Sequence, residues 1–309
     1  MGFPAHLKPA ITVLMDRGAI SFPPHPRGSG PLKLESQPRP DESTAPIAGA
    51  PSLHPRLHLH RAFPSRYLPG ARDVAVYLPP AYDRHSPRPY PVLYLQDGQN
   101  LFDGQTSFVP GRTWQVGEHA DAAIAAGEIE PLVIVGIYNA GERRLAEYTH
   151  ERDARMQGGE AAQYGQFITR ELMPWIAAHY RVRDDRASTG IGGSSLGGLV
   201  SLYLGLRHFE RFGKLALLSP SVWWNQSSIL EFVSDCAPGI SSRPRIWLDV
   251  GDQEGARTLQ DAELLARRLE ATGWRPGENL RFERVAGGTH DETAWSRRVR
   301  PMLGFLFPA

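Results

Sequence analysis

Two patterns of apolar and polar positions alternate along the chain from about residue 56. Short, mostly apolar runs are typical of strands, and they occur at 73–79, 91–97, 132–138, 186–193, 214–220, 244–251 and 279–285. Longer runs between the later strands predict helices at 160–180, 195–209, 257–273 and 292–307. This alternation predicts an α/β fold, in which a mostly parallel central sheet carries helices on both faces.

The first 55 residues follow neither pattern. Nine prolines lie between residues 22 and 55, with glycine and serine among them. Such a composition is typical of poorly ordered or extended chain. We therefore predict two parts, a proline-rich arm over residues 1–55 and a catalytic domain over residues 56–309. An ordered strap across the domain surface is the alternative for the arm.

Charge and composition exclude several classes of partner. The net charge is +1 with both signs mixed along the chain, so no basic stripe indicates a nucleic-acid partner. No apolar run approaches the roughly 20 residues that span a membrane. The apolar patch from Ile11 to Met15 is too short for a signal peptide. These features predict a cytoplasmic protein without a membrane segment; the oligomeric state, monomer or homodimer, stays open.

Metal and disulfide chemistry have little support in the sequence. Cys236 is the single cysteine, so the chain can form no internal disulfide and no cysteine-based metal site. His58 and His60 alternate on an expected strand and share a face, but no carboxylate cluster accompanies them. We expect neither a metal nor a cofactor.

A serine between glycines stands where a strand is expected to meet a helix. The segment 193-GSSLG-197 fits Gly-x-Ser-x-Gly with Ser195 at its centre. In α/β-hydrolases this motif forms a sharp turn that exposes the serine as a nucleophile. The alternative is a glycine-rich turn with a capping serine. The position between strand and helix favours the nucleophile, and Ser194 then only follows the turn geometry.

A nucleophilic serine needs a base, and the base needs an acid that orients it. Of the two downstream histidines, His208 lies too far along the helix that starts at Ser195, which leaves His290 in the loop before the last helix. The loop after residues 245–250 offers Asp252 and Glu254 as the acid. We favour Glu254, because its later position and longer side chain suit a loop that folds back over the strand ends.

The oxyanion formed during attack on a carbonyl needs hydrogen-bond donors. One candidate is the backbone N–H of Leu196 at the start of the helix after Ser195, where free N–H groups favour negative charge. The second is the backbone N–H of Gln99, in the loop that follows residues 91–97.

Several segments together resemble the putative-esterase family of α/β-hydrolases. The family includes siderophore, feruloyl and acetyl-xylan esterases, S-formylglutathione hydrolase and mycolyl transferases. The resembling segments are 72-RDVAVYLPPAYD-83, 90-YPVLYLQDGQNLFD-103, 134-IVGIYNAGERRLAEYT-149, 193-GSSLGGLVSLYLGL-206, 218-LSPSVWW-224, 248-LDVGDQEG-255 and 287-GGTHDETAW-295. The resemblance covers about residues 56–307.

The resemblance implies a role for each candidate residue. It makes Ser195 the nucleophile and His290 the base, and it places the acid three residues after the strand-ending glycine, at Glu254. Gln99 and Leu196 become the oxyanion donors. The same resemblance places Arg144, Trp223 and Trp224 near the mouth of the site. We expect these three, with Asn100 and Phe102, to bind substrate.

These roles predict a serine esterase that acts on a small-molecule ester through an acyl-enzyme. Aromatic residues and arginine near the site favour a siderophore, catechol or hydroxycinnamoyl ester. An acyltransferase and a catalytically silent binding module on the same fold are the alternatives.

Overall fold

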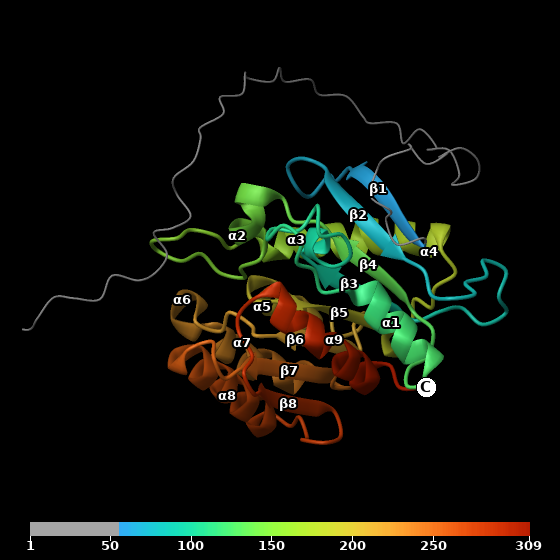
Figure 1. Ribbon diagram of the computed structural model, residues 1–309. Coiled ribbons are helices and arrows are strands. Elements are labelled where there is room, and N and C mark those ends of the chain that lie inside the picture. The colour runs from blue at the N-terminus through green and yellow to red at the C-terminus, as the bar shows by residue number, and fades with distance from the viewer. Residues whose placement is uncertain (1–55) are drawn as a thin grey trace, which may run out of the picture. The chain divides into compact units, whose positions relative to one another are not determined.

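The computed structural model describes residues 56–309, and the arm predicted for residues 1–55 lies outside the described residues. Its centre is an eight-stranded sheet in the order β1-β2-β4-β3-β5-β6-β7-β8 (Figure 1). The strands are β1 (Leu57–Phe63), β2 (Arg72–Tyr77), β3 (Val92–Gln96), β4 (Val133–Ile137), β5 (Thr189–Ser194), β6 (Lys214–Leu218), β7 (Arg245–Gly251) and β8 (Leu280–Val285). β2 pairs antiparallel with β1 and β4, whereas every pair from β4 to β8 is parallel.

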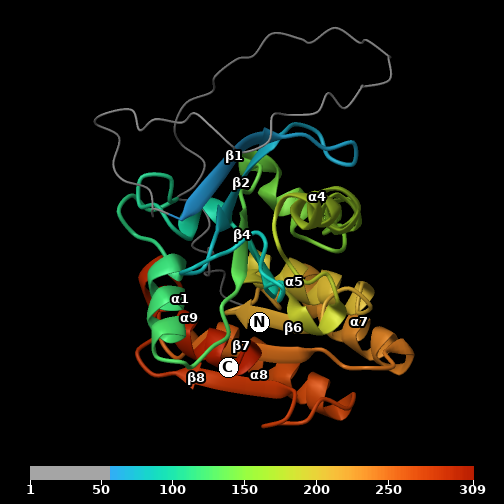
Figure 2. The ribbon, with the colours of Figure 1, turned by 90° about the vertical axis from the view of Figure 1, so that its right-hand side faces the viewer.

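Helices cover both faces of this sheet, as the alternation of strands and helices predicts. They are α1 (Val116–Ala125), α2 (Arg144–Glu147), α3 (Ala161–Phe167), α4 (Met173–His179), α5 (Leu196–Arg207), α6 (Trp224–Ser227), α7 (Ile229–Cys236), α8 (Ala256–Ala271) and α9 (Glu292–Leu306). α1 and α9 pack on one face, and α4, α5 and α7 on the other (Figure 2). Within residues 56–309, no helix combines the length and apolar character needed to cross a membrane.

The helical region expected at 160–180 is not one regular helix. A π-helical turn over Ile168–Leu172 separates α3 from α4. Pro174, near the start of α4, has no N–H to donate to the preceding turn, so the regular hydrogen-bond ladder cannot pass through it. Hydrophobic periodicity predicted the extent of the helical region but not this local change.

The parallel strands bring the loops that carry the candidate residues to one edge of the sheet. β3 lies beside β5, and β5, β6, β7 and β8 follow in order. Because neighbouring parallel strands end at the same edge, the loops after these five strands are neighbours. The site described next is built from those loops.

Candidate active site

Ser195 occupies a sharp turn between β5 and α5. Its backbone has φ 55° and ψ −123°, a conformation that side-chain-bearing residues rarely adopt. The turn is tight: a Cβ atom added to Gly193 would lie 2.9 Å from both the Gln96 Cβ and the Gly197 carbonyl carbon. Glycine is therefore needed at position 193 so that β3 and α5 can approach the turn.

Glu254 and His290 form a hydrogen-bonded pair. His290 Nδ1 lies 2.7 Å from Glu254 Oε2. The other carboxylate oxygen, Oε1, accepts hydrogen bonds from the Ser219 hydroxyl at 2.6 Å and the Gly251 N–H at 2.7 Å. Burial alone would raise the pKa of Glu254, but hydrogen bonds from His290, Ser219 and Gly251 outweigh it and lower the pKa. Glu254 is thus held as a carboxylate facing the imidazole.

The second acid candidate, Asp252, contacts a different group. Its carboxylate is exposed and accepts a hydrogen bond from the backbone N–H of Gly287 at 2.8 Å. Gly287 belongs to the loop that carries His290, so Asp252 supports the backbone of that loop. The structure brings Glu254, rather than Asp252, to the imidazole.

The Ser195 hydroxyl contacts a residue that the sequence analysis did not assign. Its Oγ lies 3.2 Å from the Ser221 Oγ, and no hydrogen bond joins Ser195 to His290 among the described residues. Hydrogen bonds between nucleophile and base are often long without substrate and shorten in the complex. Ser221 lies three residues after β6, the strand that pairs with β5, and nothing else in the sequence marks it.

Both proposed oxyanion donors stand at the starts of helical turns. Leu196 is the first residue of α5, and Gln99 lies in the short 3₁₀ turn Gly98–Asn100 after β3. The first N–H groups of a helical turn have no partner within it, so both can point to an anion. Gly98 packs directly on β4, where an added Cβ would lie 2.5 Å from the Gly136 carbonyl carbon.

Arg144 holds the loop that carries the Gln99 donor. Its Nε and Nη2 each lie 2.7 Å from a different carboxylate oxygen of Asp97, and Asn139 Nδ2 lies 2.7 Å from Asp97 Oδ1. Asp97 itself has φ 55°. Arg144 therefore supports the donor loop through a forked ion pair, and most of its side chain is buried.

Asn100 is also engaged inside the protein. It is 9% exposed, its amide nitrogen lies 3.3 Å from Glu292 Oε1, and its amide oxygen accepts the Phe108 N–H at 2.9 Å. Glu292, a buried carboxyl two residues after His290, was not singled out from the sequence. Burial raises the pKa of Glu292, as do the charges of Asp291 and Asp97.

The aromatic candidates differ in exposure. Trp224 is fully buried and its indole N–H donates to the Glu151 carbonyl at 2.9 Å. Trp223 and Phe102 are partly exposed. Only the latter two therefore present ring surface that a substrate can contact.

The His58 and His60 pair on β1 contacts a tyrosine. His58 Nδ1 and His60 Nε2 lie 3.3 Å and 2.5 Å from the Tyr180 hydroxyl. In the part of the chain that the structure describes, no group of three or more His, Cys, Asp or Glu side chains is arranged to hold a metal ion.

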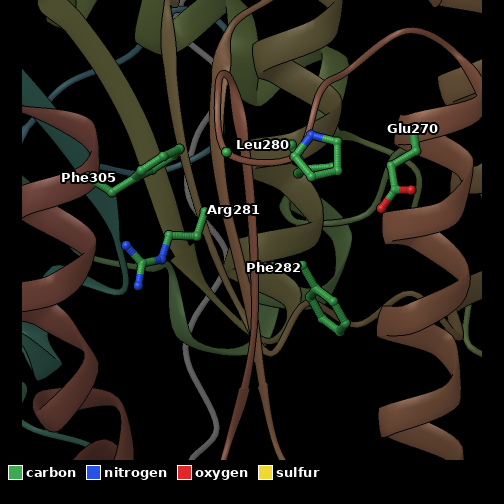
Figure 3. A pocket seen from close by; sticks show the side chains of 7 residues that line it. Glu270, Leu280, Arg281, Phe282 and Phe305 are labelled. Atoms are coloured by element: carbon green, nitrogen blue, oxygen red, sulfur yellow. The ribbon is translucent and has the colours of Figure 1, made fainter.

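A hollow of about 490 Å³ lies at the other end of β8 (Figure 3). It is lined by Glu270, Pro276, Gly277, Leu280, Arg281, Phe282 and Phe305. Leu280 begins β8 and Phe305 is near the end of α9, whereas His290 lies in the loop after β8 and before α9. The hollow is therefore separate from the candidate active site.

Comparison with known proteins gives both family and fold matches. A family model described as "Putative esterase" matches residues 65–306. The uncharacterized protein YbbA of Bacillus subtilis is 30% identical over 197 residues, which are 62% of this chain and 72% of YbbA. The iron(III) salmochelin esterase of Escherichia coli O6:H1 is 31% identical over 256 residues, or 76% of this chain and 54% of that protein. The chain thus spans about half the length of that esterase.

Solved structures show the same architecture. The crystal structure of BES protein from Bacillus cereus superimposes with a TM-score of 0.68 at 21% identity, over 86% of this chain and 100% of that one. This likeness concerns the fold, and it confirms the expected mostly parallel sheet of the α/β-hydrolase type.

Proposed function

The chain belongs to the putative-esterase family, and from that premise we propose that it is a serine esterase acting through an acyl-enzyme. The observation that carries the proposal is the strained turn at Ser195 together with the Glu254–His290 pair on neighbouring loops. Strain of this kind is characteristic of the serine nucleophile in α/β-hydrolases. A glycine-rich turn with only a capping role would not need a non-glycine residue at φ 55°.

In the proposed mechanism, the Ser195 hydroxyl attacks the ester carbonyl while His290 takes its proton. Glu254 keeps the imidazole oriented and stabilises its positive charge. The N–H groups of Gln99 and Leu196 stabilise the oxyanion. His290 then protonates the leaving alcohol, and water activated by the same imidazole releases the acid from Ser195.

We propose a siderophore, catechol or hydroxycinnamoyl ester as the substrate. The salmochelin esterase supports this class by name, and Trp223 and Phe102 offer aromatic surface. The side chains of Asn100, Arg144 and Trp224 form hydrogen bonds within the protein. These three residues would therefore support the site without contacting the substrate directly. The cytoplasmic location stays a prediction.

The test compares the purified wild-type chain with Ser195→Ala on p-nitrophenyl acetate, followed by a panel of acetyl, feruloyl, thioester and catecholate siderophore esters. Hydrolysis by the wild type alone supports the proposal. Equal hydrolysis by both proteins would remove Ser195 from the mechanism, and no hydrolysis of any ester would favour the binding module. Sugar and alcohol acceptors added to the same assay separate a transferase from a hydrolase.

A further inference from the structure

Arg298, on α9, is buried beneath the candidate site and makes contacts that the proposed mechanism does not use. Its side chain is 2% exposed, and its Nη1 lies 2.8 Å from both Asp249 Oδ1 and the Ser219 Oγ. Its Nη2 lies 3.1 Å from Glu254 Oε1 and 3.2 Å from the carbonyl oxygen of Thr289. One guanidinium therefore joins residues that follow or belong to β6, β7 and β8.

The two contacts of Nη2 bear directly on the acid and the base. Thr289 is the residue immediately before His290, so its carbonyl is part of the backbone that sets the position of the imidazole. Glu254 uses Oε2 for His290 and Oε1 for Arg298. With both carboxylate oxygens held, Glu254 cannot rotate away from the imidazole without breaking a charge-assisted hydrogen bond.

Asp249 anchors the guanidinium and balances its charge. It is fully buried on β7, and its second oxygen accepts the indole N–H of Trp247 at 2.7 Å. Burial raises the pKa of Asp249 to about 6, and the guanidinium opposes the rise. The guanidinium thus forms ion pairs with both Asp249 and Glu254.

α9 contributes a second contact to the same region. The indole N–H of Trp295 donates to the Ser219 Oγ at 3.1 Å, and its ring stands edge-on to the His290 imidazole with centroids 4.9 Å apart. Arg298 lies one helical turn further along. Residues of α9 thus contact Glu254, the imidazole of His290 and the backbone carbonyl just before His290.

We propose that Arg298, held by Asp249, is a positioning residue that fixes Glu254 and the His290 loop relative to each other. The proposal rests on the proposed serine-esterase function. Arg298 touches no reacting atom, so its loss should lower turnover by misplacing the acid and base, with little effect on substrate affinity.

The experiment measures kcat, KM and the thermal midpoint for Arg298→Gln, Arg298→Lys and Asp249→Asn with p-nitrophenyl acetate. We expect Arg298→Gln to lower kcat about 10–100-fold with KM nearly unchanged, by analogy with the loss seen when the hydrogen-bond partners of metal-binding side chains are removed. Arg298→Lys, which keeps the charge but not the fork, should recover part of the loss. Asp249→Asn should lower kcat in the same direction. If Arg298→Gln does not fold, Asp249→Asn and Arg298→Lys provide the test.

Two controls lie on the same helix. Arg300 pairs with Glu128 at the surface, so Arg300→Gln should leave kcat unchanged. Leu303 is fully buried among apolar side chains, so Leu303→Ala should lower the thermal midpoint without lowering kcat in the folded enzyme. Wild-type kcat in Arg298→Gln, or an equal loss of kcat in Leu303→Ala, would overturn the positioning role.

A spectroscopic measurement separates this proposal from the proposed function. The short hydrogen bond between His290 Nδ1 and Glu254 predicts a far-downfield proton resonance that does not depend on ester hydrolysis. Its loss in Arg298→Gln and retention in Arg300→Gln support the positioning role even if the wild type hydrolyses no ester. An unchanged resonance in Arg298→Gln contradicts it.

Discussion

Gly98→Ala tests whether the turn carrying Gln99 supplies an oxyanion donor. The added Cβ would lie 2.5 Å from the Gly136 carbonyl carbon, 2.7 Å from its oxygen and 2.8 Å from the Ile137 nitrogen. All three atoms belong to the backbone of β4 in the middle of the sheet, so no side-chain rotation relieves the clash. An ordinary contact needs about 3.4 Å or more, and the turn must therefore move by nearly an ångström.

The expected loss of kcat and of stability depends on how far the movement displaces the Gln99 N–H and strains the packing around Gly98. Losing one oxyanion donor costs about 10²–10³ in kcat, or roughly 2.7–4 kcal/mol of transition-state stabilisation. Overpacking a well-filled site costs about 1–3 kcal/mol of stability. We expect a loss of turnover near the lower end of the first range, because the donor is displaced rather than removed, with a fall of several degrees in the thermal midpoint.

The assay is kcat for p-nitrophenyl acetate, with thermal unfolding measured in parallel. Gly304→Ala is the matched control, because a Cβ at Gly304 in α9 meets no atom within 4 Å. It should leave kcat unchanged and stabilise the chain by up to about 1 kcal/mol through helix propensity. Wild-type kcat in Gly98→Ala would refute the placement of the donor at Gln99.

The remaining predictions concern the triad, acid stability and the arm. Glu254→Gln should lower kcat by about 10⁴ and Asp252→Asn far less; kinetics with the ranking reversed would exchange their roles. Ser195→Ala should abolish labelling by a fluorophosphonate and Ser194→Ala should not, as read by mass spectrometry of the labelled peptide. Burial lowers the pKa of His60 to about 4, so the unfolded chain binds that proton more tightly and stability is lost as pH falls from about 6.5 toward 4. His60→Gln should lessen that acid loss by about 1–2 kcal/mol in urea unfolding at pH 7 and pH 5, allowing for partial exposure, and an identical acid loss would contradict it. Deletion of residues 1–50 should leave a folded esterase by circular dichroism and turnover, and an insoluble product would assign the arm a structural role.

Sequence patterns predicted the centre of the sheet well, because β3, β4, β6 and β7 are short, largely apolar runs that are almost wholly buried. They did not predict α1 or α7. α1 begins after Gln115, which has φ 50° and forms no side-chain cap, so the usual starting signal is missing. α7 is an eight-residue helix whose apolar run from Ile229 also fits other structures.

Sequence alone indicated those candidate residues that are recognised by their place relative to a strand or helix. Ser195 follows its strand directly, and His290 is the one downstream histidine in a loop at the correct edge of the sheet. The contacts of Ser221, Glu292 and Arg298 were not predictable, because they depend on side chains from separate elements meeting below the surface. The same reason explains Asn100 and Trp224, which were expected to bind substrate at the mouth of the site but are buried.

The division of the site among loops suggests a use for the protein as a split reporter. Gln99 follows β3, and Ser195 and Leu196 lie where β5 meets α5, whereas Glu254 and His290 follow β7 and β8. The exposed turn around Gly239 separates the two sets in the chain. A cut there would give one fragment with the nucleophile and another with the acid and base. With the roles proposed above, neither fragment alone would hydrolyse an ester. Colour from a chromogenic ester would then report that two fused partners had brought the fragments together.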